Sequence, residues 1–320
     1  HASMRALISR LESISTDLGI LATANKLWLG EGEKLRFPYL RLLQEDDRSD
    51  ARVLNFAKDP EGSRKTINAW VEKKTNDRIK DLLQPGGVGR DTVLILTNAI
   101  YFNSLWSFPF EAQNTKPLRF RTAKDKTKEL PTMYQQRNFL YNDSDGVQIV
   151  KLPYETPGIS MLVLLPRVTE KFDQMQALEK KLWSDEGSRT LKTWIGGMKE
   201  RKIDLWLPKF QQGQRFMLNE ALKVLGMKDA FSANADFSGI LETNKGRDAP
   251  IAISAVIHQT FVVVDEVKTE AAASTAVTIQ RASLPIPEET TEFRADHPFL
   301  YLIMDDLTGT ILFFGRQGFN

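Results

Sequence analysis

The sequence contains no cysteine in its 320 residues. It therefore has no disulfide framework, no thiolate zinc site and no cysteine nucleophile. The absence of cysteine does not settle the compartment in which the protein works. It does remove thiol chemistry from the functions that the chain could perform.

Histidine is also scarce, because the chain has only His1, His258 and His297. A Ser-His-Asp triad or a histidine metal site would depend on the last two. Neither lies in a nucleophile-elbow or His-Glu-x-x-His context. His258 lies within an apolar strand pattern and His297 precedes Pro298 at a strand start, so we predict structural roles for both. We therefore expect no catalytic residue, no metal and no cofactor.

Charge of one sign is not in excess, with 43 Lys+Arg against 41 Asp+Glu and no long run of either. This balance gives no indication of a nucleic-acid groove or of an anionic membrane surface as partner. No apolar stretch approaches the ~18 residues that a membrane-spanning helix needs. We therefore expect neither nucleic acid nor membrane among the partners.

The order of predicted elements is mixed, with no repeat, no βαβ alternation and no linker that divides the chain. This order predicts an α+β fold in a single domain over residues 5–320. Residues 1–4, His-Ala-Ser-Met, are interpreted as a cloning remnant. The patterns predict helices over residues 5–13, 63–81 (with Ser63 as cap), 172–183 and 218–225. They predict strands over residues 19–28, 92–102, 147–154, 159–165, 202–209, 251–265, 299–304 and 311–315.

Residues 261–293 carry the pattern most relevant to function. An apolar strand is followed by small residues and then by a polar stretch with two prolines. Two alternating sets within the small-residue part are typical of a strand with one face toward a core. Alanine and serine are poor strand formers, so the segment can also remain a surface loop, and we predict that it is bistable. The inward set is Thr269, Ala271, Ala273, Thr275, Val277 and Ile279; the outward set is Glu270, Ala272, Ser274, Ala276, Thr278 and Gln280.

Residues 266–275, Glu-Val-Lys-Thr-Glu-Ala-Ala-Ala-Ser-Thr, closely resemble the proximal hinge of inhibitory serpins. Further motifs resemble this family in order along nearly the whole chain. Each is a weak signal alone, and together they identify the sequence as similar to the serpins. They are Asn98-Ala99-Ile100-Tyr101-Phe102 with Trp106, Leu152-Pro153-Tyr154, Leu207-Pro208-Lys209-Phe210, Ala235-Asp236-Phe237-Ser238-Gly239-Ile240, Asp296-His297-Pro298-Phe299-Leu300 and residues 311–316.

The resemblance implies a serpin fold with a large central mixed β-sheet, two smaller sheets, surrounding helices and an exposed reactive-centre loop. It implies that His258 and Asn98 are partners in the shutter region, where the main sheet opens, and that Trp106 lies in the breach region at the top of this sheet. A monomer is expected, and a secreted or extracytoplasmic location is favoured. The hinge residues would be Glu266, Lys268, Thr269, Glu270, Ala271, Ala272, Ala273, Ser274 and Thr275.

The function implied is serine protease inhibition by a suicide-substrate mechanism, in which the loop is cleaved, traps the acyl-enzyme and inserts into the main sheet. By counting from Glu266, the reactive bond would be Ala282–Ser283, which suits an elastase-like or subtilisin-like protease. The alternative bond, Arg281–Ala282, suits a trypsin-like protease. The alternative function is a non-inhibitory serpin-like protein whose loop is only a substrate or a binding element.

Two departures from the family pattern stand out. Lys268 occupies a hinge position that is usually glycine, but it shares the parity of Glu270 and can point outward. We therefore expect slower or unaffected insertion rather than its loss. The N-terminal helices and strand of the family are expected to be missing from this sequence.

Overall fold

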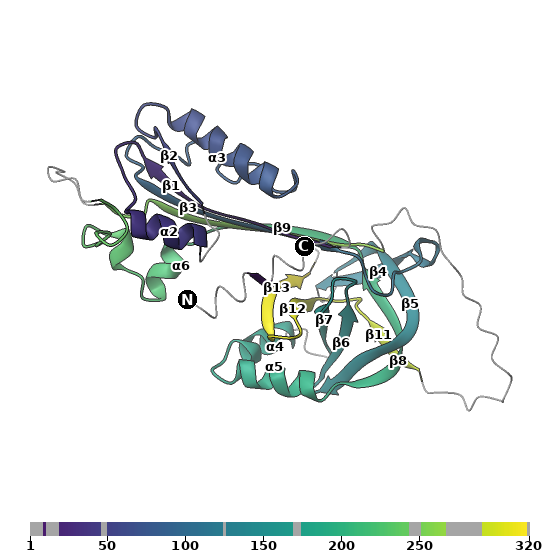
Figure 1. The fold of residues 1–320 in the computed structure, drawn as a ribbon. Coiled ribbons are helices and arrows are strands. Elements are labelled where there is room, and N and C mark those ends of the chain that lie inside the picture. The colour runs from purple at the N-terminus through teal and green to yellow at the C-terminus, as the bar shows by residue number, and fades with distance from the viewer. Residues whose placement is uncertain are drawn as a thin grey trace. The chain divides into compact units, whose positions relative to one another are not determined.

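The computed structural model describes residues 9–10, 19–45, 50–123, 126–168, 174–242, 251–266 and 290–318. Within these residues no helix is long and apolar enough to cross a membrane. The chain divides into two compact units (Figure 1). The first unit holds residues 1–103 and 211–263, and the second holds residues 104–210 and 264–320. A single domain over residues 5–320 stays a prediction.

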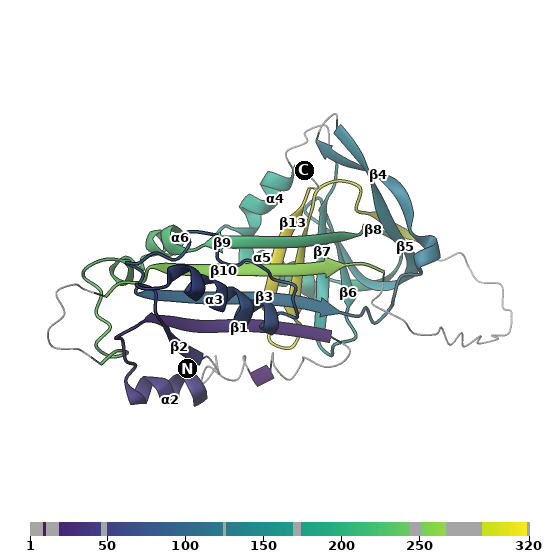
Figure 2. The ribbon, with the colours of Figure 1, turned by 90° about the horizontal axis from the view of Figure 1, so that it is seen from above.

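The first unit contains a five-stranded sheet whose strand order is β2-β1-β3-β10-β9. Figure 2 shows β1, β3, β10 and β9 side by side, with α3 lying over one face of the sheet. Strand β1 pairs parallel to β2, and β10 pairs parallel to β3. The strands are β1 (Gly19–Gly30), β2 (Asp50–Leu54), β3 (Leu94–Ser104), β9 (Phe210–Met217) and β10 (Ala255–Val264); the helices are α2 (Phe37–Glu45), α3 (Pro60–Lys74), α6 (Asn219–Val224) and the short 3-10 turn η2 (Asp229–Phe231).

Helix α3 begins and ends earlier than the predicted helix over residues 63–81. The side chain of Asp59, rather than Ser63, accepts a hydrogen bond from the Gly62 N–H, and proline follows Asp59 at the first helical position. This is a favourable N-terminal arrangement because proline has no N–H to satisfy there. The helix ends at Lys74 because Asn76 and Asp77 adopt positive φ angles, which leave the right-handed helical region.

The five-stranded sheet is covered on both faces by apolar clusters. One cluster joins side chains of α3 and of residues 75–92 to β1, β3 and β10. The other cluster joins Leu27, Leu29 and Leu94 to Leu241 and neighbouring side chains. Because alternate strand residues point to opposite faces, β3 contributes to both clusters. The predicted strand over residues 92–102 is therefore confirmed as buried from both sides.

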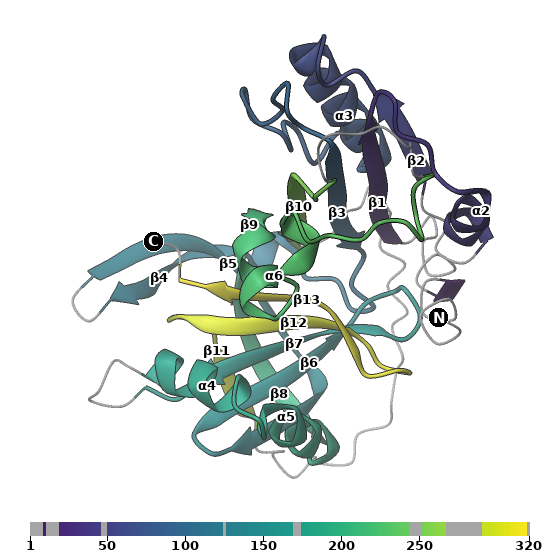
Figure 3. The same ribbon diagram turned by 90° about the vertical axis from the view of Figure 1, so that its left-hand side faces the viewer.

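The second unit contains an eight-stranded sheet with the order β11-β8-β5-β6-β7-β12-β13, in which β4 also pairs with β5. The 19-residue strand β5 joins the partners β4 and β8 to the hairpin of β6 and β7. Figure 3 shows α4 and α5 beside the strands of this sheet. The strands are β4 (Lys116–Ala123), β5 (Lys126–Ser144), β6 (Val147–Pro153), β7 (Ile159–Pro166), β8 (Lys199–Pro208), β11 (Thr291–Arg294), β12 (Phe299–Asp305) and β13 (Thr310–Gln317); the helices are the 3-10 turn η1 (Ala112–Asn114), α4 (Gln174–Leu182) and α5 (Gly187–Gly196).

The α+β class is confirmed, and so is the predicted hairpin, whose strands are β6 and β7. Every residue of β7 is buried, since helices α4 and α5 contribute to the core beside it. The predicted helix at residues 218–225 is α6, and it is followed by Gly226 with φ +104°, a conformation that glycine adopts without steric cost.

Candidate functional site

Strands β3 and β10 lie directly side by side in the middle of the five-stranded sheet. Eight residue pairs run in register from Ala255 opposite Ile95 to Val262 opposite Phe102. We call this pairing the seam. Both strands point the same way, so a chain that reversed direction after β10 would run antiparallel to both.

Asn98 and His258, which the resemblance assigned to the region where the sheet opens, are paired opposite each other across the seam. The Asn98 side-chain oxygen is hydrogen-bonded to His258 Nδ1, and the Asn98 amide donates to Asn25 on β1. The Phe216 ring stacks on the imidazole, with 6.1 Å between ring centroids. These side chains link β1, β3, β10 and β9 on one face of the sheet.

The His258 imidazole is half-buried and this burial disfavours its charged form. Burial lowers the pKa of His258 below its ordinary value of 6.5, and the hydrogen bond with Asn98 offsets only part of the effect. A neutral imidazole has one donor and one acceptor nitrogen, and protonation would replace the acceptor. The sequence predicted a hydrogen-bonded structural histidine here, and the contacts are of that kind.

Glu266, the first predicted hinge residue, lies two residues after the end of β10 and is held in place by several contacts. Its carboxylate accepts a hydrogen bond from Thr115 Oγ1 at 2.7 Å and forms an ion pair with Lys209 Nζ at 2.5 Å. Its carbonyl oxygen accepts from the Phe110 N–H at 3.1 Å. We call Glu266 with Phe110, Thr115 and Lys209 the hinge anchor.

The side chain of Glu266 is only 12% exposed, so its charge depends on these partners. Burial alone would raise the pKa of Glu266, but the hydrogen bonds from Lys209 and Thr115 lower it below its ordinary value of 4.5. The anchor thus holds an ionised carboxylate two residues after the end of β10. Lys209 belongs to the Leu207-Pro208-Lys209-Phe210 motif. This motif is the feature of the sequence from which the Lys209–Glu266 ion pair could have been predicted.

Trp106 lies two residues after β3. It contacts Phe110 of the hinge anchor and the backbone of Asp265, the residue before Glu266. Its indole Nε1 donates to the Asp265 carbonyl at 2.9 Å, and its ring stacks on Tyr154 at 4.3 Å between centroids. Phe110 meets the indole edge-on at 6.1 Å. Burial raises the pKa of the Tyr154 hydroxyl far above its usual range. The residue before Glu266 is therefore fixed by a buried aromatic stack.

Most of the predicted loop lies outside the described residues. This applies to the hinge positions Lys268, Thr269, Glu270, Ala271, Ala272, Ala273, Ser274 and Thr275, and to Arg281, Ala282 and Ser283 at the reactive bond. Of the predicted hinge residues the structure places Glu266.

His297 is the other histidine that could have served catalysis, and the structure places it at a buried turn. Its Nδ1 lies 2.7 Å from Asp296 Oδ1, and its Nε2 donates to the Pro166 carbonyl at 2.7 Å. The Nδ1 contact is therefore local to the turn, and the Nε2 bond joins the start of β12 to the end of β7. Among the described residues, no group of three or more His, Cys, Asp or Glu side chains could hold a metal ion.

Comparison with known proteins gives one family for this chain. The profile of the family described as Serpin (serine protease inhibitor) matches residues 1–317. Serpin B4 of Homo sapiens is 36% identical over 320 residues, which cover 99% of this chain and 78% of that protein.

Two solved structures show the same fold. Uncleaved ovalbumin superposes with a TM-score of 0.85 at 30% identity, covering 100% of this chain and 79% of that one. Human thyroxine-binding globulin, solved with its hormone, superposes with a TM-score of 0.81 at 26% identity, covering 98% of this chain and 78% of that one. The chain is therefore similar both to ovalbumin and to a thyroxine-binding globulin, and it matches a family described as serine protease inhibitors.

Proposed function

The chain belongs to the serpin family, and from this premise we propose that it inhibits serine proteases as a suicide substrate. In this proposal the segment after Glu266 is the bait. A protease cleaves it, and the freed segment becomes a new strand of the five-stranded sheet before the protease can complete its reaction.

The observation that carries the proposal is the seam. Strands β3 and β10 pair directly and in parallel, and the hinge-like sequence begins two residues after β10 ends. A segment that reverses direction at Glu266 would run antiparallel to both neighbours, and antiparallel pairing is slightly more stable per residue than parallel pairing. The first residues of the inward set, from Thr269 to Thr275, have small side chains, so they would enter the sheet with little rearrangement of the side chains packed on its faces.

Insertion would supply the driving force. A central strand of about ten residues gains hydrogen bonds on both edges, which outnumber those of the β3–β10 pairing that it replaces, and at ~1 kcal/mol net per bond the surplus contributes on the order of 10 kcal/mol. That energy is comparable to the ~5–15 kcal/mol stability of a whole domain. The intact protein would then be a kinetically trapped state, and loop insertion of this kind is strand addition that releases stored strain, a device known from serpins in general.

The chemistry belongs to the protease. Its serine Oγ attacks the carbonyl carbon of Ala282 and forms an ester, the bond to the Ser283 nitrogen breaks, and the catalytic histidine gives that nitrogen its proton. Water would normally hydrolyse the ester. Insertion that distorts the protease before this step leaves the ester intact, so the complex survives denaturation.

The proposed reactive bond defines the protease class. Ala282 is small and fits the shallow specificity pockets of elastase-like or subtilisin-like enzymes. If the bond is Arg281–Ala282 instead, the partner is a trypsin-like enzyme with an acidic pocket. A different protease class would not alter the role proposed for the seam.

The second candidate is a non-inhibitory serpin, and the similarity to human thyroxine-binding globulin favours it. Lys268 would slow insertion in that case, because a charged side chain replaces the usual glycine of the hinge. The loop would then be cut without trapping the protease.

Denaturing gel electrophoresis after incubation with elastase, subtilisin and trypsin separates the two candidates. We expect a band that survives boiling in detergent with at least one enzyme, with the mass of the protease plus residues 1–282, because the cleaved C-terminal fragment is released. Mixing with catalytically inactivated protease is the control, since no ester can form. Conversion to two fragments by all three enzymes, without such a band, would identify a substrate rather than an inhibitor.

A further inference from the structure

The face of the sheet opposite Asn98 and His258 carries a second connection across the seam. Residues 75–92, here called the cover segment, follow α3 and lie over the sheet. Leu82 and Leu83 are 0% and 1% exposed and belong to the cluster that contains Ile95 and Tyr101 of β3 and Ile257 of β10. The cover segment therefore belongs to a core that includes side chains from both strands of the seam.

One end of this connection is fixed to α3. The Asn68 amide makes two hydrogen bonds with the backbone of Leu83, each of 2.9 Å, accepting from its N–H and donating to its carbonyl. Arg64 donates to the same carbonyl at 2.8 Å. Asn68 is 5% exposed, so these bonds are shielded from water. Three hydrogen bonds thus attach Leu83 to the helix.

Helix α3 is itself fixed to β1, on the β3 side of the seam. The Trp70 ring of α3 meets the Trp28 ring of β1 edge-on at 5.5 Å. The ammonium group of Lys26 lies over both rings, 4.6 Å from Trp70 and 5.1 Å from Trp28. Lys26 is 6% exposed, so this cation–π contact is largely desolvated and favourable. Helix α3 is therefore attached to β1, and the cover segment is attached to α3, so we expect both to stay with β1 and β3 if the seam opens.

The other end of the connection is on β9, beyond β10. The Arg215 guanidinium donates to the Leu82 carbonyl at 3.1 Å. Arg215 and Phe216 are consecutive, so they point to opposite faces of the strand; Phe216 stacks on His258, and Arg215 therefore lies on the covered face. These contacts form a continuous connection that crosses the seam. It runs from β1 through α3 and the cover segment to Arg215 on β9.

A strand inserted at the seam moves β10 and β9 away from β3 by one strand spacing, about 4.8 Å. A hydrogen bond of 3.1 Å cannot persist through that displacement. Within the described part of the chain, three hydrogen bonds hold Leu83 to α3, whereas Arg215 of β9 holds Leu82 by a single bond from an exposed side chain. The Arg215 bond is the weaker link and breaks first.

We propose that Arg215 is a positioning residue that holds the seam closed through Leu82 and so limits the rate of strand insertion. This inference rests on the proposed function, because it concerns the sheet opening that inhibition would need.

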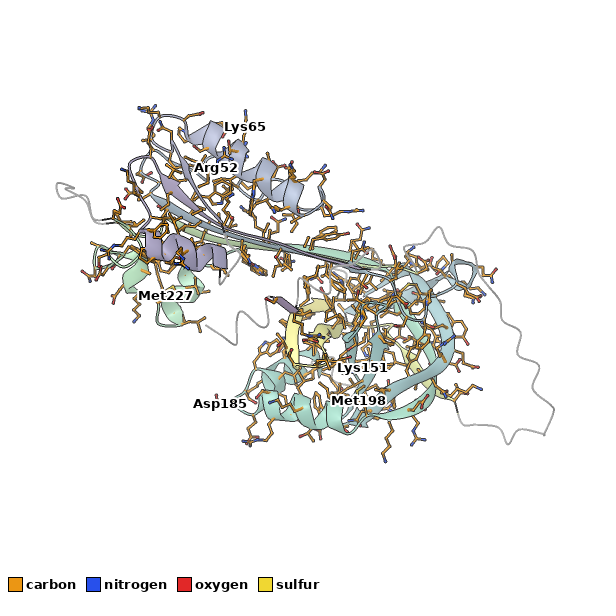
Figure 4. The ribbon with its side chains drawn as sticks, in the orientation of Figure 1. Arg52, Lys65, Lys151, Asp185, Met198 and Met227 are labelled. Carbon is orange, nitrogen blue, oxygen red and sulfur yellow. The ribbon has the colours of Figure 1, made fainter. Side chains whose placement is uncertain are left out.

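The test uses a synthetic peptide with the sequence of residues 269–279, labelled with a fluorophore and incubated with the intact protein. Its uptake rate is followed by fluorescence anisotropy for wild type, for Arg215→Met and for Arg52→Met. Arg52 is the matched control, an exposed arginine on β2 at the other edge of the same sheet (Figure 4). Because Arg215 is exposed, solvent screening reduces its hydrogen bond to the strength of an ordinary neutral one, and its loss predicts roughly five-fold faster uptake by Arg215→Met. Arg52→Met is expected to match wild type.

A second measurement separates this role from a merely structural one. The Arg215 bond exists only before insertion, so Arg215→Met should melt at a lower temperature than wild type when empty and at the same temperature when loaded with peptide. Equal uptake rates for wild type and Arg215→Met, or an equal melting deficit in both states, would overturn the role of Arg215. Absence of peptide uptake by wild type would overturn strand insertion itself, and the inference with it.

Discussion

Replacing Glu266 by glutamine tests whether the start of the loop is held by charge. Thr115 can still donate to the amide oxygen, but Lys209 loses its carboxylate partner. A hydrogen bond to a charged group contributes ~1.5–3 kcal/mol. The Lys209 side chain is 35% exposed, so solvent screening reduces this contribution. We expect E266Q to lower the free energy of unfolding by about 1–2 kcal/mol.

The effect should depend on pH in a defined direction. Burial works against ionisation of Glu266, but Lys209 and Thr115 outweigh it and hold its pKa below 4.5. The unfolded chain therefore binds a proton more readily than the folded chain in acid. The stabilisation is complete above about pH 4.5 and is lost as the pH falls through the lower folded-state pKa. The difference between wild type and E266Q should shrink in that range.

Urea unfolding followed by tryptophan fluorescence measures this difference at about pH 7 and about pH 3.5. Glu292→Gln is the control, because Glu292 pairs with Arg294 while its side chain is 62% exposed. The double variant E266Q/K209M should cost less than the sum of its parts, since both changes remove the same contact. An equal cost of E266Q at both pH values, or full additivity, would refute the reasoning.

Three further predictions concern the seam and the loop. Thr269→Arg should turn an inhibitor into a substrate, because a buried guanidinium at the head of the inward set slows insertion; an unchanged yield of the detergent-stable complex would contradict the assigned face. Burial lowers the pKa of His258, so its contribution to stability is complete above about pH 6.5 and is lost as the pH falls toward the folded-state value; urea unfolding across this range should show a slope that His258→Gln removes. Mass spectrometry of the small C-terminal fragment should find Ser283 at its start, whereas Ala282 at its start would move the reactive bond to Arg281–Ala282.

Apolar runs and turn residues made much of the fold predictable from the sequence. Strands β3, β7 and β12 are dominated by apolar residues, as continuous burial requires, and they were located within a few residues. Strand β9, Phe-Gln-Gln-Gly-Gln-Arg-Phe-Met, was missed because polar residues and glycine dominate it. It forms a strand because it pairs with β10. Gly213 permits a close approach of the Phe261 ring of β10, since a Cβ atom at position 213 would lie only 3.2 Å from that ring. Tertiary contact, rather than local propensity, makes this segment a strand.

The candidate site was predictable only where family motifs mark it. Asn98 and His258 are 160 residues apart, and nothing in the local patterns states that they are opposite each other in register. The resemblance supplied that pairing. Thr115 and Arg215 carry no motif and have ordinary surroundings in the sequence, so their contacts with Glu266 and Leu82 emerge only when the strands are placed.

The most direct test of loop insertion is the melting temperature of the protein before and after a single cut within residues 276–290. If the freed segment becomes a central strand worth about 10 kcal/mol, the cut protein should melt about 20 °C or more above the intact protein, at ~2 °C per kcal/mol for a chain of this size. A cut protein that melts at the same temperature as the intact one, or below it, would contradict the account.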